Sequence, residues 1–273
     1  MLEIICGVPQ GSILGPLLFL IYINDIVKVS TSVMPLLYAD DTNLFCSGKD
    51  TSEIIGTLNN ELKLYMRWMH VNKLTVNVDK TKVIIFRKPK RQPSNQIDEI
   101  KLNGNIIEKV PSMKFLGVIL DETLSWLAHI NYIKNKIAKG IGVICKAKRF
   151  LYSSSLLSLY NSFIQPYLIY CIEGWGCTFT TYLEPLWRLQ KRAVRLIKSL
   201  SYRQETHLAF KELHILNIFQ LYKYFTLIFM FKVKKGMVWN FSNILITSMR
   251  LEVLPCTEFH TAKRPSPREA YAI

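Results

Sequence analysis

The chain has 273 residues, which allows one large domain or two small ones, and its 49% hydrophobic content excludes a wholly disordered chain. Its 35 Lys and Arg residues outnumber its 20 Asp and Glu residues, and the net charge of +15 favours a polyanionic partner. The six cysteines form no CxxC pair and no zinc pattern with histidine, which excludes a zinc ribbon and indicates packing roles in a reducing compartment.

The first 50 residues predict a helix and then a hairpin. A turn at residues 8–12 precedes the apolar segment Leu17 to Ile26, and Pro16 near its start is tolerated in a first helical turn. We expect this helix to be mostly buried. Two short apolar runs then flank Tyr38-Ala39-Asp40-Asp41, a pattern that predicts two strands joined by a tight turn with the acids at its tip.

The two adjacent carboxylates, Asp40 and Asp41, suggest a cation site. Neighbouring carboxylates repel each other unless a cation lies between them, and an oxygen-only ligand set suits Mg²⁺. The alternative is an ordinary solvated turn, because Asp is common in turns. The tetrapeptide alone favours the turn, and the motifs around it favour the cation site.

The next 70 residues continue the mixture of helix and strand. Asp50 to Glu53 has the spacing of a capping box, and the apolar residues behind it follow a helical period. A strand is predicted at 81–86, and a polar loop follows it at 87–99. Asn103-Gly104-Asn105 predicts a second hairpin, and Met113 to Leu120 reads as one further strand. Up to residue 86 the order is that of a β-α-β-β-α-β fold without its first, central strand.

After residue 123 the pattern becomes helical. An apolar stripe predicts a helix along residues 127–144 and consists of Leu127, Ile130, Ile133, Ile137, Ile141 and Ile144. Two further helices are expected near 154–172 and 182–200. Residues 205–235 also look helical, with Phe225, Phe229 and Phe231 in packing roles. From about Glu252 the chain is polar and contains proline, so we expect a disordered tail.

Basic residues are concentrated in the helical half, where residues 134–203 hold twelve Lys or Arg and two acids, Glu173 and Glu184. This excess suits a phosphate backbone, and the alternatives are a solvated basic face or an anionic membrane surface. The residues expected to contact nucleic acid are Lys134, Lys139, Lys146, Lys148, Arg188, Lys191, Arg192 and Arg195.

Neither of the two long apolar runs is expected to enter a membrane. The run from Ile13 to Ile23 is preceded by Glu3 and by no Lys or Arg, unlike a signal peptide. The run from Leu151 to Ile172 holds five serines, an Asn, a Gln and a Pro, which favours a buried helix pair. We therefore expect an intracellular protein of the cytoplasm and nucleus, without stable membrane insertion.

Several ordered motifs resemble the reverse transcriptases of non-LTR (LINE-type) retrotransposons, especially the jockey-like clade. They are the segment Gly7 to Phe19 with its Pro-Gln-Gly turn, Tyr38 to Asp41, Asn72 to Thr81, and Phe115 to Val118. Segments around Leu124-Ser125-Trp126, Tyr160 to Tyr170, Trp175-Gly176 and Gln190-Lys191 resemble the same family's thumb and the region after it. The resemblance covers roughly residues 1–235.

The resemblance implies an α+β fold, a ferredoxin-like polymerase palm followed by an all-α thumb-like region. It implies RNA-directed DNA polymerisation at a two-metal site, with Mg²⁺ or Mn²⁺ as cofactor and an RNA template, a DNA primer and dNTPs as partners. On matching positions, Asp40 and Asp41 would hold metal, and Lys80 or Lys82 would protonate pyrophosphate, although a solvated strand end is as good a reading of both lysines. The positions expected to contact substrate are Gln10, Gly11, Tyr38, Ala39, Phe115, Leu116 and Gly117.

The sequence departs from this family at its first palm strand. Nothing in residues 1–6 matches the aspartate that bridges both metals, since Glu3 lacks the flanking pattern, and Asp25 reads as a capping or surface residue. The fingers are also absent. We therefore expect a 5′-truncated fragment with an incomplete palm at 1–122, a basic helical thumb region at 123–235 and a poorly structured tail at 236–273. It is predicted to bind metal weakly and to be inactive alone. The alternatives are a non-catalytic RNA- or DNA-binding remnant and a decaying copy without function.

Overall fold

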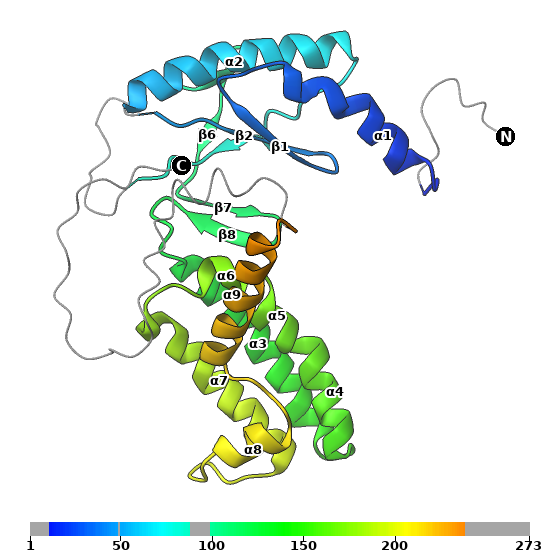
Figure 1. Ribbon diagram of the computed structural model, residues 1–273, viewed down its shortest axis with the longest axis vertical. Coiled ribbons are helices and arrows are strands. Elements are labelled where there is room, and N and C mark those ends of the chain that lie inside the picture. Colours follow the sequence, from blue (N-terminus) through cyan, green and yellow to red (C-terminus); the bar gives the residue numbers. More distant parts are fainter. Residues whose placement is uncertain (1–10, 49, 88–98, 238–273) are drawn as a thin grey trace. The chain divides into compact units, whose positions relative to one another are not determined.

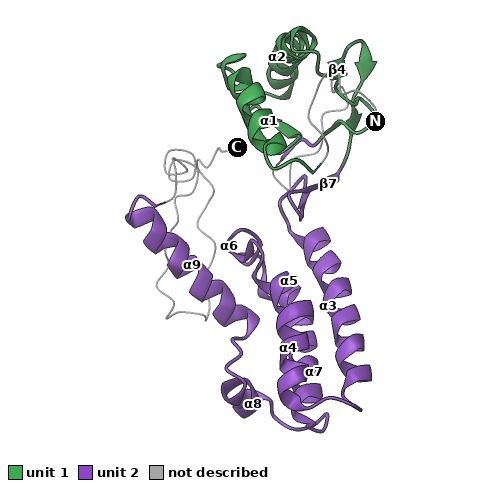
Figure 2. Cartoon of the chain, turned by 90° about the vertical axis from the view of Figure 1, so that its right-hand side faces the viewer, with its two compact units in different colours: residues 1–83, 89–110, 271–273 green, residues 84–88, 111–270 purple. Residues whose placement is uncertain are grey.

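The computed structural model describes residues 11–48, 50–87 and 99–237 and divides them into two compact units (Figures 1 and 2). The first unit comprises the described residues up to 83 together with 99–110, and the second comprises 84–87 and 111–237. Both strands and helices are present, as the sequence predicts. The expected disordered tail from Glu252 lies outside the described residues.

The first unit begins with helix α1 (Gly15–Ile23) and the 3-10 helix η1 (Asn24–Lys28). Strands β1 (Met34–Tyr38) and β2 (Asp41–Phe45) then form the predicted antiparallel hairpin, in a register that pairs Tyr38 with Asp41. Helix α2 (Thr51–Val71) starts where the capping-box spacing places it, but the Asp50 side chain makes no capping hydrogen bond. The prediction of the helix start is confirmed, and that of a side-chain cap is wrong.

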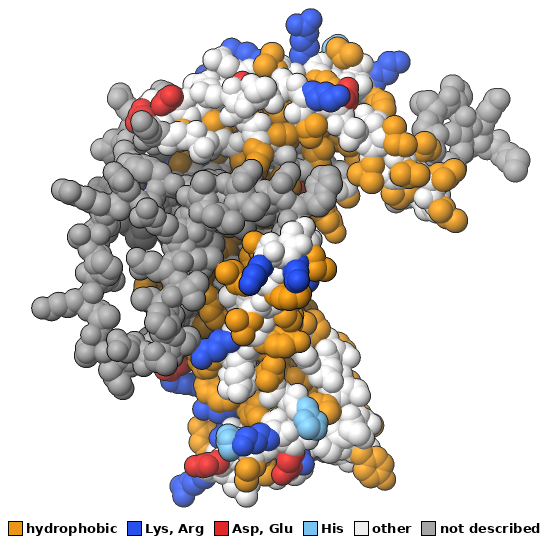
Figure 3. Space-filling view, viewed as in Figure 1, with side chains coloured by type: hydrophobic (Ala, Val, Ile, Leu, Met, Phe, Trp, Pro, Cys, Tyr) orange, Lys and Arg blue, Asp and Glu red, His pale blue; other side chains and the backbone are white. Residues whose placement is uncertain are grey.

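Helix α1 is mostly exposed, so the prediction of a buried helix is wrong. Ile23 is its one buried residue, and apolar side chains cover its outer surface, as the orange patch over α1 shows (Figure 3). The apolar composition predicts burial, but the described part of the first unit supplies no second layer over this helix. The exposed large apolar side chains in α1 and in the two residues before it are Ile13, Leu14, Leu17, Leu18, Leu20, Ile21 and Tyr22.

The remaining strands of the first unit are short. Strand β3 (Lys82–Val83) pairs in parallel with β6 (Glu108–Lys109), while β4 (Lys101–Leu102) and β5 (Asn105–Ile106) form the predicted hairpin. Asn103 and Gly104 both have positive φ in its two-residue turn, at 51° and 82°. The predicted strand at 81–86 is therefore two residues long, and β3 is not paired with the β1–β2 hairpin.

Two small clusters hold the first unit together. One joins α2 to the β4–β5 region and consists of Ile55, Leu62, Ile100, Leu102 and Ile107. The other joins the end of α1 and η1 to α2 through Ile23, Ile26 and Tyr65. Of the apolar residues that follow a helical period along α2, Leu62 and Tyr65 are buried, whereas Ile54, Leu58 and Met69 are half-buried.

The second unit opens with a hairpin where one strand was predicted. Strands β7 (Ser112–Phe115) and β8 (Val118–Asp121) are antiparallel, and Leu116 and Gly117 form the turn with φ of 44° and 89°. The single strand at 113–120 is thus wrong, because Gly117 allows the chain to reverse inside a continuous apolar run. The predicted boundary at residue 122 separates this hairpin from the helices, whereas the second unit contains both.

Helices make up the rest of the second unit. They are α3 (Leu127–Ala147), α4 (Ser153–Phe163), α5 (Gln165–Ile169), α6 (Ile172–Trp175), α7 (Thr180–Lys198), α8 (His207–Glu212) and α9 (Ile218–Lys234). The predicted stripe is buried from Ile130 to Ile144, whereas its first residue, Leu127, is exposed. Helix α3 packs against α4 and α7 around the buried part. The expected helix near 154–172 is divided among α4, α5 and the start of α6. Phe225 packs against the core, but Phe231 is exposed, contrary to the prediction.

None of the described helices is both long enough and apolar enough to cross a membrane.

Candidate functional site

The β1–β2 hairpin presents Tyr38, Ala39, Asp40 and Asp41 at its tip, and all four are exposed. Ala39 has a φ of 52°, in the left-handed region that an L-residue adopts at a cost of about 1–2 kcal/mol. The two-residue connection is the shortest of the common hairpin loops, so Asp40 and Asp41 both lie at the same end of the hairpin. The tip is therefore built as the sequence predicts.

The carboxylates of Asp40 and Asp41 have no cationic partner among the described residues, where every ion pair involves other side chains. Their oxygens are hard ligands of the kind that Mg²⁺ and Mn²⁺ prefer. The described residues hold no group of three or more Asp, Glu, His or Cys side chains that could enclose a metal ion. The donor chemistry at the tip fits a divalent cation, while the number of donors suits weak binding.

Other predicted positions in the first unit lie apart from this tip in the chain. Gly11 is exposed with a φ of 87°, and a Cβ added to it would meet nothing within 4 Å, while Gln10 lies outside the described residues. Lys82 forms an ion pair of 2.6 Å with Glu108 across the β3–β6 pair, while Lys80 is exposed in the turn before β3. An exposed pair of this kind contributes little stability, and it leaves the choice between Lys80 and Lys82 open. Asp25 is exposed in η1, in agreement with a surface role.

In the second unit, the tip of the β7–β8 hairpin carries Phe115, Leu116 and Gly117. Tyr170, which follows α5, donates a hydrogen bond of 2.6 Å from its hydroxyl to the Leu116 carbonyl oxygen. Its ring lies close enough that a Cβ added at Gly117 would meet it at 3.2 Å. The sequence gives no signal for this contact, because the two residues are 54 positions apart.

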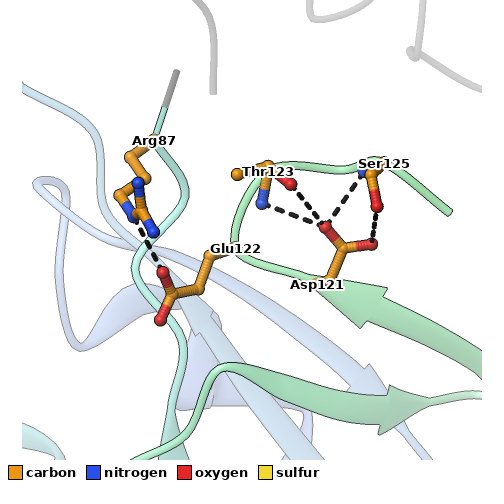
Figure 4. A network of polar contacts seen from close by, with 5 residues as sticks. All are labelled: Arg87, Asp121, Glu122, Thr123 and Ser125. Atoms are coloured by element: carbon orange, nitrogen blue, oxygen red, sulfur yellow. Dashed lines mark hydrogen bonds and ion pairs between the residues drawn. The ribbon is translucent and has the colours of Figure 1, made fainter. Parts of the chain in front are cut away.

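A polar loop joins this hairpin to α3 (Figure 4). The Asp121 carboxylate accepts hydrogen bonds from Thr123 and Ser125, both from backbone and from hydroxyl groups, and from the Trp126 N–H. Burial alone would raise the pKa of Asp121, but these hydrogen bonds outweigh it and lower the pKa below the usual 3.8. Next to it, Glu122 pairs with Arg87 at 2.8 Å.

His129 of α3 binds the β7–β8 hairpin through a hydrogen bond to strand β8. Its Nδ1 accepts a hydrogen bond of 3.2 Å from the Ile119 N–H, so the neutral ring carries its proton on Nε2. The ring lies edge-on to Trp175, and burial lowers its pKa from 6.5 to about 4. His129 is therefore a neutral structural residue at physiological pH. Its sequence context, His129-Ile130, resembles the family's thumb but does not indicate this structural role.

The basic residues predicted on α7 share one face of the helix. Leu186, Gln190 and Val194 are buried, and Arg188 and Arg192 are exposed on the opposite side. Three of the predicted cations have partners: Arg188 pairs with Glu184 at 2.9 Å, Lys191 lies over the Trp187 ring, and Arg195 donates to the Gln204 carbonyl oxygen.

The basic residues predicted on α3 are more scattered. Lys139 and Lys146 are seven positions apart and share an exposed side of the helix, whereas Lys134 projects at a different angle. Lys148 follows the helix as its C-cap residue and is half-buried. Lysines here do not form one stripe, so α7 is the clearer basic surface of the second unit.

Comparison with known proteins gives a consistent set of matches. Residues 2–120 match the family described as reverse transcriptase (RNA-dependent DNA polymerase). The chain is 26% identical over 214 residues to the RNA-directed DNA polymerase from mobile element jockey of Drosophila melanogaster, covering 74% of this chain and 23% of that protein. It is 23% identical over 226 residues to the probable RNA-directed DNA polymerase from transposon X-element of the same species, covering 80% and 24%.

A third relative is the retrovirus-related Pol polyprotein from type-1 retrotransposable element R1 2 of Nasonia vitripennis, 28% identical over 181 residues, which cover 62% of this chain and 43% of that protein. The chain spans less than a quarter of the length of the jockey polymerases. No solved structure matches it.

Proposed function

The chain is a relative of the RNA-directed DNA polymerases of non-LTR retrotransposons, and from that premise we propose that it is part of a reverse transcriptase palm followed by a thumb-like helical region. The first unit carries the acidic hairpin of the palm, and the second carries the β7–β8 hairpin and the thumb-like helices. The proposed reaction of the whole enzyme is nucleotidyl transfer from dNTPs to a DNA primer on an RNA template.

The observation that carries this proposal is the exposed Tyr38-Ala39-Asp40-Asp41 tip within the matched residues 2–120. A turn that served only to connect two strands has no need of two adjacent carboxylates without cationic partners, because their mutual repulsion costs free energy. A site for a divalent cation gives both acids a role. Asp40 and Asp41 would hold Mg²⁺ or Mn²⁺, which supplies charge neutralisation at phosphate oxygens when bound.

We expect no polymerisation from the 273-residue chain alone. Two-metal transfer needs carboxylates that bridge both ions, and the sequence ahead of the Pro-Gln-Gly turn contains Glu3 as its single acidic residue. With Asp40 and Asp41 as the cation ligands, metal binding is expected to be weak.

A primer-extension assay tests this directly. The purified chain is incubated with an RNA template, an annealed DNA primer, dNTPs and Mg²⁺, and the expected result is no extension beyond that of the Asp40→Ala variant. Asp79→Ala is a matched change at an exposed acid and serves as the control. Extension that is abolished by Asp40→Ala and kept by Asp79→Ala would overturn the expected inactivity, and it would support the assignment of the hairpin.

The basic face of α7 favours a second candidate function, binding of a primer–template duplex without chemistry. Arg192 and Arg188, which is paired with Glu184, are exposed one helical turn apart, a spacing that suits contacts with successive phosphates of one strand. This role needs no metal site and survives the loss of catalysis.

The binding role is tested by fluorescence anisotropy with a labelled RNA–DNA duplex over a range of KCl concentrations. Affinity is expected to fall steeply with salt, and Arg188→Ala/Arg192→Ala is expected to make that dependence shallower. Lys211→Ala/Lys223→Ala removes the same charge from α8 and α9 and serves as the control. Binding that does not change with salt would remove this candidate.

A further inference from the structure

A groove of about 700 Å³ lies in the first unit between the second half of α2 and the β4–β5 hairpin. Both elements belong to the same unit and pack against each other through α2 and β4 (Figure 2). The volume is within the range of about 300–1,000 Å³ that ligand sites occupy. The groove shares no residue with the Asp40–Asp41 tip or with the basic face of α7.

One wall of the groove is a row of cationic or titratable side chains. Lys63, Arg67 and His70 follow one another at spacings of four and three, so they lie on one side of α2, and all three are exposed. Lys63 and Arg67 make no ion pair with any described residue. Lys101 faces the groove from β4 but is already paired with Glu99 at 2.9 Å. The unneutralised charge of the wall therefore comes from Lys63 and Arg67.

The other surfaces of the groove are apolar or offer neutral donors. Leu62, Met66, Leu74 and Val76 supply an apolar floor, and no Asp or Glu is among the lining residues. At the far side, Asn103 and Gly104 form the β4–β5 turn, and nothing lies within 4 Å of a Cβ built on Gly104. A ligand can thus approach the backbone of this turn closely.

We propose that this groove binds single-stranded nucleic acid. Lys63 and Arg67 contact two phosphates of the strand, and the intervening nucleoside lies over Met66 and Leu74. A cationic wall beside an apolar floor fits a ligand in which anionic phosphates alternate with flat apolar bases. The apolar floor favours a single strand, because the bases of a duplex are stacked inside it and cannot lie on Met66 and Leu74. The cations contact phosphates, so the charge-dependent part of the binding is independent of sequence.

The test measures how salt changes the affinity of the full chain for a fluorescein-labelled single-stranded RNA of mixed sequence. Each phosphate contact adds about 0.7 to the slope of log affinity against log salt concentration for a single strand. Lys63→Ala/Arg67→Ala is therefore expected to lower the slope by about 1.4 and the affinity at 0.1 M salt by about tenfold or more. Alanine suits an exposed helical position, so α2 is retained.

The matched control is Lys28→Ala/Lys109→Ala, which removes two exposed cations of the same unit that do not line the groove. Both slope and affinity of this control are expected to stay near those of the unchanged chain. Photo-crosslinking with 4-thiouridine in the same RNA is expected to label peptides from residues 62–76. A slope change equal to that of the control, or crosslinks confined to other peptides, would overturn the proposal.

One further outcome separates this site from a membrane-binding surface. Vesicles rich in anionic lipid could bind to the chain through Lys63 and Arg67 while RNA binding does not depend on these residues. That result would mean that the groove binds a membrane surface and that the proposal is wrong. None of these measurements involves primer extension or the α7 variants. The groove can therefore bind a strand even if the chain proves to have no part in polymerisation. Equally, the proposed function can hold even if the groove binds no strand.

Discussion

At the scale of single residues, the carboxylate of Asp121 organises the loop between β8 and α3. One oxygen accepts from the Thr123 N–H, the Thr123 hydroxyl and the Ser125 N–H, and the other accepts from the Ser125 hydroxyl and the Trp126 N–H. Trp126 is the N-cap residue of α3, has a φ of 66° and makes no side-chain cap of its own. Asp121 therefore fixes the turn that leads into α3, and the Ser125 hydroxyl oxygen, held in this turn, accepts from the Leu127 N–H at the start of the helix.

We expect Asp121→Asn to destabilise the second unit by about 1–3 kcal/mol at pH 7. The amide replaces one accepting oxygen by an NH₂ group, which is itself a donor and would face the N–H and O–H donors of the loop. Urea unfolding followed by circular dichroism measures the loss. Asp79→Asn, at an exposed acid, should change the free energy of unfolding little. Equal stability of the two variants would show that the hydrogen bonds of Asp121 do not stabilise the folded state.

The same residue predicts a pH dependence. The folded-state pKa of Asp121 is lowered below 3.8, so its contribution is fully present above the unfolded-state pKa and is lost as the pH falls through the folded-state value. The difference in free energy of unfolding between the unchanged chain and Asp121→Asn should therefore shrink as the pH is lowered below about 4. A difference that grows toward low pH would have the wrong sign.

Two hairpin glycines provide a matched pair. Gly117 and Gly104 have φ of 89° and 82°, so alanine is strained at both, but a Cβ at Gly117 also meets the Tyr170 ring at 3.2 Å while one at Gly104 meets nothing. Gly104→Ala should cost about 1 kcal/mol from strain, and Gly117→Ala should cost more. Hydrogen exchange of the β7 and β8 amides measures the loss of stability in Gly117→Ala, and exchange of the β4 and β5 amides measures it in Gly104→Ala. Equal losses at both turns would mean that Tyr170 moves aside freely.

At the scale of elements, Gln190 links three helices in the second unit. Its side chain is fully buried on α7, donates to the Tyr160 hydroxyl of α4 and to the Leu216 carbonyl, and accepts from the Ile218 N–H at the start of α9. All of its polar atoms thus have partners, and α9 gains an acceptor for one of its free N–H groups.

We expect Gln190→Met, which keeps the volume, to destabilise the second unit by about 2–4 kcal/mol, because it leaves several buried polar groups without partners. Tyr160→Phe removes one of these bonds and should cost less. Chemical denaturation of both single variants and of the double variant measures the coupling. Additive effects would indicate that Gln190 and Tyr160 act independently.

Elements whose signal is local were predicted correctly, and those that depend on distant partners were not. The Tyr38–Asp41 hairpin and the buried stripe of α3 follow from turn chemistry and helical period, and both are present as predicted. The β7–β8 hairpin was missed, because Leu116-Gly117 lies inside an apolar run that reads as one strand. Its support by Tyr170 and His129 comes from residues at least 10 positions away, which no local pattern reveals. The candidate carboxylates were therefore predictable, whereas the groove beside α2 was not.

At the scale of the whole molecule, the two units have cores of very different size. The core of the second unit runs continuously from Ile130 to Leu221 and includes the fully buried Trp175 and Tyr160. The first unit has two small clusters, short strands in separate pairs, and an apolar helix α1 whose outer face is exposed. Since burial of apolar surface supplies most of the stabilising free energy, the first unit should be the less stable of the two.

Hydrogen exchange measured by mass spectrometry should therefore show two levels of protection. Amides of α3, α4 and α7 are expected to exchange only through unfolding of the second unit. Amides of β1, β2 and α2 are expected to exchange faster, through opening of the first unit alone. A low concentration of urea should accelerate the exchange of the β1, β2 and α2 amides before that of the α3, α4 and α7 amides, because opening the first unit costs less free energy. Equal protection of α2 and α3, with the same urea dependence, would mean that the chain unfolds as one cooperative body. The free energy holding the Asp40–Asp41 tip in place would then come from the helical core as well as from its own hairpin.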